Sequence, residues 1–116
     1  MAVKKVNEQD ISEQIKLYDE LILLFPEIER KGKTLPYTSV NGNMFSFLSK
    51  EGELSIRLPE NERELFIKKY KSQLSVQHGV VMKEYVVVPE ELLKDKKEIK
   101  KYFKLSFEYT SSLKKK

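Results

Sequence analysis

The side chain best suited to acid–base or nucleophilic chemistry in this chain is its single histidine, His78. An imidazole beside a serine and an aspartate can activate a hydroxyl nucleophile, and its unperturbed pKa lies near neutrality. His78 is followed directly by Gly79, and this pair is typical of an exposed turn. We therefore expect His78 to belong to a turn and not to a catalytic site.

Two pairs of carboxylates come next, Glu51 with Glu53 and Glu90 with Glu91. Neighbouring carboxyl groups can take different pKa values and act as acid and base. The first pair falls at the rim of a predicted hairpin, and the second at a predicted helix start, where the helix dipole favours acidic side chains. With no cysteine and one histidine, a transition metal would find almost only oxygen ligands, and no calcium-loop spacing occurs. We predict no enzymatic activity, no cofactor and no metal.

Charged residues inside an apolar run mark a possible contact surface. Lys83 and Glu84 interrupt the β-branched run 80–88, beside Tyr85. They indicate either a functional polar cluster or an edge strand protected by charge. The chain also holds 6 Phe and 6 Tyr, more than we expect a core of this size to hide. The predicted interaction residues are Tyr37, Lys83, Tyr85 and Tyr102.

Positive charge gathers in the C-terminal half. Residues 1–58 carry 8 Lys and Arg against 9 Asp and Glu, and residues 59–116 carry 14 against 9. A run of lysines could follow a phosphate backbone, with Tyr102 placed to stack on a base. Interleaved acids and the lack of arginine in this run favour a solvated helix face instead. The candidate nucleic-acid contacts are Lys97, Lys100, Lys101 and Lys104.

Composition indicates one compact domain over residues 1–116, with flexible ends at 1–7 and 114–116. The first ten residues lack the apolar centre of a signal peptide, and the longest apolar run, 21–26, is too short to span a membrane. The absence of cysteine suits a reducing compartment. We expect a soluble, cytoplasmic protein that does not act at a membrane.

The elements that would position these residues begin with a helix. Apolar residues from Ile11 to Phe25 recur at helical spacing, and Asp10 with Glu13 has the form of a capping box. Pro26 ends this pattern or opens a further turn over 27–31. From residue 33 the period changes to two, which predicts strands over 34–40 and 43–49 joined by Asn41 and Gly42.

The third predicted strand holds Leu54, Ile56 and Leu58 on a buried face, with Ser55 and Arg57 in solvent. Pro36 assigns the first strand to an edge of the sheet. A second helix then runs from Pro59 through an apolar stripe of Leu65, Phe66 and Tyr70. Strands over 73–76 and 80–88 follow, the latter well buried, and Pro89 begins another helix.

The last segment has two readings. Phe103, Leu105, Phe107 and Tyr109 alternate with polar residues as in a strand. A stripe from Ile99 through Phe103 and Phe107 to Leu113 is equally helical, and we favour the helix because the lysines then share its far side. The expected fold is α+β, an antiparallel meander sheet of four to five strands, with an N-terminal, a middle and a C-terminal helix packed on it.

Several strings resemble a known family. They are FPEIERKG, NGNMFSFL with Met44 and Phe45 after the turn, ELSIRLPENERELF and MKEYVVVPEELL. Through these strings, the chain resembles the TfoX N-terminal domain family over residues 20–113. The last helix of YjbR-like proteins is also similar to the string that holds Ser106, Phe107, Thr110 and Leu113. The resemblance implies helices packed on a meandering antiparallel sheet and supplies no catalytic residues. Relatives that regulate competence carry a second domain, which the printed chain lacks, and many carry a glycine-rich first strand where residues 34–39 stand here.

These observations lead to one expected function and one alternative. We expect a non-catalytic cytoplasmic domain that acts through protein contacts, with a second copy of itself as a homodimer or with another protein. The alternative is a nucleic-acid-associated regulatory domain that uses the C-terminal lysines.

Overall fold

A computed structural model describes residues 11–114 of the chain. The expected helix cap Asp10 and the ends expected to be flexible, 1–7 and 115–116, lie outside the described residues, whereas Lys114 lies inside them. Within the described range the elements are α2 (Ser12–Leu23), β1 (Tyr37–Val40), β2 (Asn43–Leu48), β3 (Leu54–Arg57), α3 (Glu60–Tyr70), β4 (Leu74–Gln77), β5 (Val80–Val88), α4 (Glu90–Leu93) and α5 (Lys96–Ser111). This order of helices and strands confirms the predicted α+β class.

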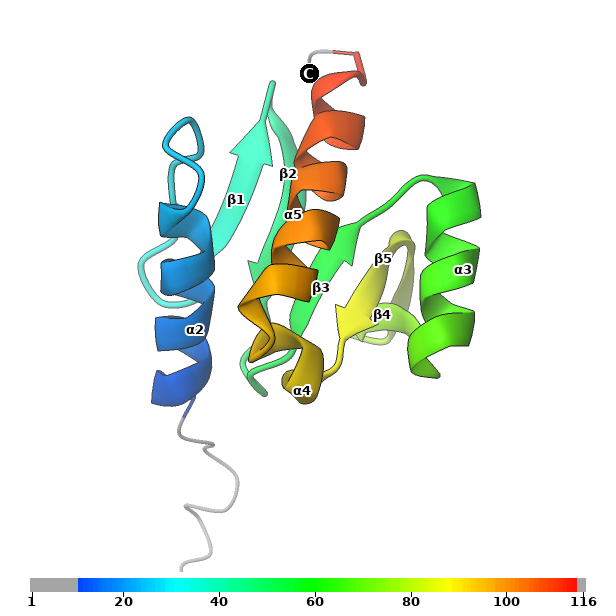
Figure 1. The fold of residues 1–116 in the computed structure, drawn as a ribbon, viewed down its shortest axis with the longest axis horizontal. Helices are drawn as coiled ribbons and strands as arrows, with labels where there is room; N and C mark the ends of the chain where they lie inside the picture. The colour runs from blue at the N-terminus through cyan, green and yellow to red at the C-terminus, as the bar shows by residue number, and fades with distance from the viewer. Residues whose placement is uncertain (1–10, 115–116) are drawn as a thin grey trace, which may run out of the picture.

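The five strands form one antiparallel sheet in the order β1-β2-β3-β5-β4. Strands β1 to β3 are the predicted meander, and β1 lies at an edge, as Pro36 requires. After β3 the chain passes through α3 to the opposite edge, where β4 begins, and β5 then returns beside β3 (Figure 1). The two hairpins β1–β2 and β4–β5 therefore occupy opposite ends of the sheet.

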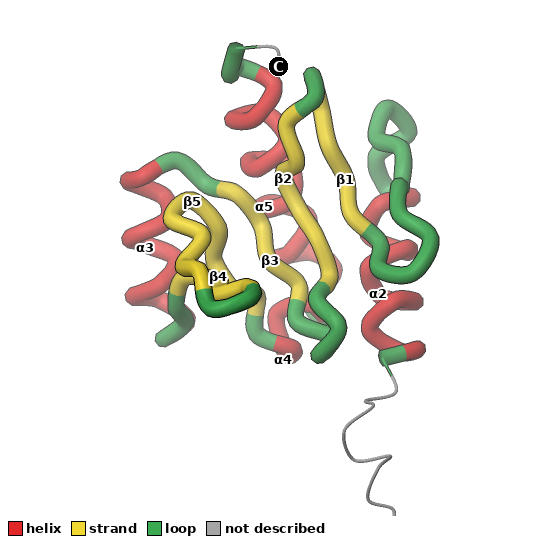
Figure 2. Tube along the Cα trace, turned by 180° about the vertical axis from the view of Figure 1, so that it is seen from behind, coloured by secondary structure: helices red, strands yellow, loops and turns green. Residues whose placement is uncertain are grey.

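Within residues 11–114, the helices lie toward one face of the sheet. Figure 1 shows α4 and α5 in front of the strands, with α2 and α3 at the two sides, and the view from behind in Figure 2 shows the strands with no helix in front of them. The covered face holds the core, in which the fully buried Phe103 of α5 is central. Its ring lies 6.5 Å from that of Tyr18, 5.3 Å from that of Phe25 and 5.5 Å from that of Phe45. Edge-to-face and tilted contacts of this kind stabilise a core beyond simple burial.

Both predicted two-residue turns are present. Asn41 and Gly42 have φ values of 56° and 81°, and His78 and Gly79 have φ values of 53° and 76°. Positive φ at both central positions gives the twist that suits a tight hairpin. The first turn is also held by α5, because Asn41 Nδ2 donates to the Ser111 carbonyl at 3.2 Å and Asn43 Nδ2 donates to the Lys114 carbonyl at 3.1 Å.

The ambiguous C-terminal segment is helical, as favoured, and the strand alternative is excluded. Asp95 caps α5 by accepting a hydrogen bond from the backbone N–H of Glu98 at 3.3 Å. Of the two alternatives at Pro26, the structure shows the end of the helical pattern, because α2 ends at Leu23, a turn at 26–27 follows, and the next residues lead as a loop to a backbone bridge between Lys31 and Tyr37.

Three burial predictions were also wrong. Leu65 is 62% exposed, because α3 packs on the rest of the protein through Phe66, whose ring lies 5.1 Å from that of Tyr102. Ser55 is buried and not in solvent, because the β4–β5 hairpin folds over it. At the start of β5, Val80 and Val81 are exposed, because this half of the strand pairs only with the edge strand β4.

Candidate functional site

A β-bulge in β2 decides which side chains lie on the helix-free face. Thr38 pairs with Ser46 and Ser39 pairs with Met44, so Phe45 is an extra residue without a partner in β1. An extra residue shifts the alternation of side chains along the strand. Phe45 and Ser46 both face the helices, where Phe45 contacts Phe103 and the Ser46 hydroxyl bonds that of Tyr18. Met44 and Phe47 are left on the opposite face.

Aromatic side chains connect the strands across this helix-free face. Tyr37 of β1 is the register partner of Phe47, and the Phe47 ring lies 5.7 Å from that of Tyr85 on β5. The Tyr85 hydroxyl donates to the backbone carbonyl of Met44 at 2.7 Å and thus reaches over β3 to β2. The ring contact and the hydrogen bond hold Phe47 and Tyr85 in place on this face.

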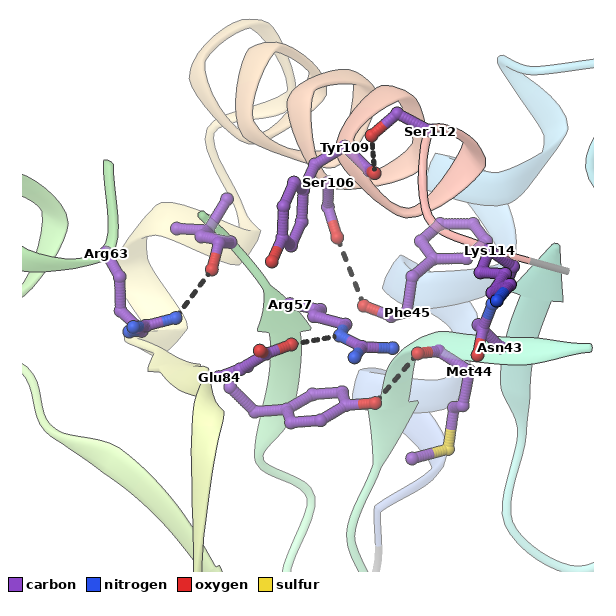
Figure 3. Close-up of polar contacts among 12 residues, drawn as sticks. Asn43, Met44, Phe45, Arg57, Arg63, Glu84, Ser106, Tyr109, Ser112 and Lys114 are labelled. Atoms are coloured by element: carbon purple, nitrogen blue, oxygen red, sulfur yellow. Dashed lines mark hydrogen bonds and ion pairs between the residues drawn. The ribbon is translucent and has the colours of Figure 1, made fainter. Parts of the chain in front are cut away.

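An ion pair borders the aromatic row. Arg57 Nε lies 2.6 Å from Glu84 Oε1, and Figure 3 shows the two side chains pointing toward one another. The Arg57 guanidinium also lies 5.7 Å from the centre of the Tyr85 ring. Burial raises the pKa of Tyr85, and the Arg57 cation opposes this in part. Tyr85 therefore keeps its proton and remains a hydrogen-bond donor.

The β4–β5 hairpin folds back over the helix-free face and creates a cleft. Ser55 Oγ of β3 donates to Ser75 Oγ of β4 at 2.9 Å, and both serines are buried. The cleft has a volume of 260 Å³ and lies between the hairpin and the strands β1 and β2. We call it the sheet-face cleft, and its lining residues are Leu35, Pro36, Tyr37, Met44, Phe47, Leu48, Ser49, Gln77, His78 and Met82.

The chemistry available in the sheet-face cleft is apolar contact with a few hydrogen bonds. Its lining holds no carboxylate and no lysine or arginine, and its only imidazole, His78, is exposed at the hairpin turn. Among residues 11–114, no group of three or more His, Asp or Glu side chains could hold a metal ion. The cleft is therefore shaped to receive apolar groups.

The structure separates the predicted interaction residues. Tyr37 lines the cleft and Tyr85 adjoins it, but Tyr102 lies on the helical side, where its ring is 5.8 Å from that of Tyr70. Lys83 is exposed on β5. It belongs to the stretch Lys83 to Tyr85 that interrupts the register of β5 with β4, so the charged interruption in the sequence marks the bend of the hairpin.

The candidate nucleic-acid contacts share one exposed face of α5. Lys97, Lys100, Lys101 and Lys104 are all exposed. Lys101 Nζ lies 3.3 Å from Glu98 Oε1, and a shallow surface near it also holds Glu62 and Glu108. This face is thus of mixed charge.

Sequence reasoning missed Met44, Phe47 and Met82 as site residues. The sequence did contain a signal for these residues. All residues that line the cleft come from the two longest stretches without Asp, Glu, Lys or Arg, which are 34–49 and 72–82. These two uncharged stretches meet in space only because β4 and β5 occupy the end of the sheet and fold back. The two uncharged stretches are visible in the sequence, but the sequence does not show that they lie side by side in the fold.

Taken together, these features define an α+β domain whose antiparallel sheet is packed with helices on one face and carries a small apolar cleft on the other. The family model of the TfoX N-terminal domain matches residues 30–109. The chain belongs to this family, and the resemblance drawn from its strings is confirmed. No curated protein and no solved structure is matched. No helix within residues 11–114 has the length and apolar character needed to cross a membrane.

Proposed function

We propose that this chain is a non-catalytic protein-interaction domain of the cytoplasm, and that it holds an uncharged apolar segment of another protein in the sheet-face cleft. The observation that carries the proposal is the pre-formed apolar cleft on the helix-free face, with its aromatic wall fixed by the hydrogen bond from Tyr85 to Met44. The cytoplasmic placement rests on the lack of cysteine in the chain.

The size of the cleft favours a peptide side chain over a whole small molecule. Pockets that enclose drug-sized ligands span about 300–1,000 Å³, whereas this cleft holds 260 Å³. One or two apolar side chains of an extended segment would fill it. The flexible thioethers of Met44 and Met82 suit such a site, because methionine adapts its shape to different apolar partners.

The charge of the lining favours an uncharged segment. In a chain with 34% charged residues and a net charge of +4, the cleft is lined by none. A carboxylate or ammonium group entering it would lose water without gaining a partner, which is unfavourable. We therefore expect selection for apolar, uncharged sequence.

A titration with blocked peptides tests this proposal. The probes are a short Ser-Leu-Ile-Ser peptide and a Ser-Lys-Glu-Ser peptide, followed through the methyl NMR signals of Met44 and Met82. We expect saturable shifts with the apolar peptide only. The variant Met82→Lys should abolish them, and the matched variant Leu65→Lys, on the exposed face of α3, should not. Absence of shifts with the apolar peptide, or equal shifts with both peptides, would contradict the proposal.

A second candidate function is nucleic-acid association through the lysine face of α5, favoured by the exposure of Lys97, Lys100, Lys101 and Lys104 on one side of that helix. Neutralising phosphates with lysines releases counterions, so affinity should fall steeply with salt. Binding of duplex DNA at low salt that is lost in a Lys97→Gln/Lys100→Gln/Lys104→Gln variant would support it. No binding at low salt would remove it.

A further inference from the structure

The two edge strands of the sheet, β1 and β4, differ in whether another segment of the chain pairs with them. The β1 edge is covered, because the Lys31 N–H donates to the Tyr37 carbonyl and the Tyr37 N–H donates to the Lys31 carbonyl, both at 2.9 Å. The β4 edge is the last strand on its side of the sheet. Natural proteins protect such edges with charge, proline or a covering segment. Residues 72–82, which hold β4, the turn and the start of β5, contain no Lys, Arg, Asp, Glu or Pro.

The backbone geometry of the hairpin shows which groups face outward at this edge. Gln77 pairs with Val80 across the two-residue turn, and Val76 pairs with Val81. In a hairpin with a two-residue turn, the pair next to the turn exchanges both hydrogen bonds, and the following pair exchanges none. The N–H and C=O of Val76 therefore point away from β5, out of the sheet, where a further strand would bind.

The side chains at this edge are apolar and exposed. Val76 is 51% exposed and Val81 is 49% exposed. Because the two residues are direct register partners, their side chains lie together on the same face of the hairpin. This valine pair lies on the face of the hairpin opposite to Ser75 and Met82, which face the sheet and its cleft.

We infer that the β4 edge binds a second copy of this chain, antiparallel, about a two-fold axis that passes between the two Val76 residues. Each Val76 N–H then donates to the Val76 carbonyl of the other copy. The four valines Val81, Val76 and their two counterparts form one continuous apolar row across the joined sheets. A two-fold axis uses the same surface on both copies, so the edge must be complementary to itself.

The absence of charge is what permits self-pairing in this positively charged chain. With Val76 on the axis, residues 75–77 of one copy lie opposite residues 77–75 of the other, and β4 with its turn, 74–79, contains no lysine, arginine or carboxylate. Like charges therefore do not meet, although the chain carries a net charge of +4. A partner of different sequence would have no such requirement, so the neutral edge favours a second copy. This inference goes beyond the proposed function, because it uses the outer edge and not the sheet-face cleft.

Sedimentation and cross-linking test the inference. We expect the wild-type chain to show a concentration-dependent monomer–dimer equilibrium by analytical ultracentrifugation. Val76→Lys places two lysines on Cα atoms about 5.5 Å apart and replaces the apolar contact by like charges, which should raise the dissociation constant by at least roughly tenfold. Leu65→Lys makes the same change at an exposed leucine on α3 and should leave the equilibrium unchanged. A wild-type chain that stays monomeric from micromolar to millimolar concentration would overturn the inference.

A cysteine variant fixes the register and remains informative if Val76→Lys fails to fold. The chain has no cysteine, so a single introduced thiol reports without background. Facing residues of a hydrogen-bonded pair lie within the Cα separation that a disulfide accepts. Val76→Cys should form a covalent dimer under mild oxidation much faster than Leu65→Cys. Equal rates for the two variants would show that Val76 does not lie on the axis and would overturn the inference.

Discussion

Ser46 lies at the centre of a buried chain of three hydroxyl groups, and removing it should cost more than its size suggests. Its Oγ bonds both the Tyr18 hydroxyl and Thr38 Oγ1, and all three residues are fully buried. Ser46→Ala removes one oxygen atom and with it two buried hydrogen bonds, one to each of the other two hydroxyls, which also lie within hydrogen-bonding reach of each other. A buried hydrogen bond contributes about 1 kcal/mol net, so the loss of two predicts a cost of about 2 kcal/mol.

The matched variants each remove one of the two outer hydroxyl groups and leave the central hydroxyl of Ser46 in place. Tyr18→Phe leaves Ser46 bonded to Thr38, and Thr38→Val leaves Ser46 bonded to Tyr18. Each deletes one hydrogen bond while its partner keeps another, so we expect a loss near the usual net value of about 1 kcal/mol. The central variant should thus be the most destabilising, although Tyr18→Phe and Ser46→Ala each delete a single oxygen.

Urea unfolding followed by far-UV circular dichroism measures these differences, because the chain has no tryptophan for fluorescence. An unchanged slope with a shifted midpoint would attribute each effect to stability. If Ser46→Ala costs no more than Tyr18→Phe, the hydroxyl chain does not contribute as described. A loss of this size matters because domains of this kind are stable by only about 5–15 kcal/mol.

Three further predictions concern burial and backbone strain. Thr110 Oγ1 is buried without a hydrogen-bond partner, so Thr110→Val should be neutral or raise the free energy of unfolding by up to about 1 kcal/mol, and a clear loss in urea unfolding would disprove this. Burial raises the pKa of Tyr18 above its ordinary value of 10.0. The native state therefore holds this proton more tightly than the unfolded chain does, and the free energy of unfolding should fall above pH 10 by about 1.4 kcal/mol per pH unit. Tyr18→Phe should reduce that slope. An alanine at Gly79, at φ 76° in open space, should cost about 1 kcal/mol. Gly32→Ala should cost more, because its Cβ would lie 2.2 Å from the Leu35 carbonyl oxygen, and equal melting temperatures would refute the comparison.

Local signals predicted the elements whose conformation depends on neighbouring residues. Asn41 with Gly42 and His78 with Gly79 tolerate the positive φ that tight turns need, so both of these turns could be placed from the sequence. Pro89, with its fixed φ, similarly placed the start of α4.

The features that depend on distant contacts could not be predicted. The sequence around Phe45 alternates as any strand does, and only the pairing with β1 shows the bulge that turns Phe45 and Ser46 to the same face. The burial of Ser55 depends on Ser75, twenty residues later, folding over it. The sheet-face cleft results from the same folding of the β4–β5 hairpin over the sheet. Tyr37 and Tyr85 could be singled out as aromatic residues, but the other residues around the cleft could not be predicted, because they come together only in the fold.

The two asparagine contacts to α5 have a practical consequence. Asn41 and Asn43 hold the tip of the first hairpin against the carbonyls of Ser111 and Lys114, at the last turn of the chain that the structure describes. None of these four residues lines the sheet-face cleft, so a reporter group attached near Lys114 would lie beside the hairpin tip without occupying the cleft.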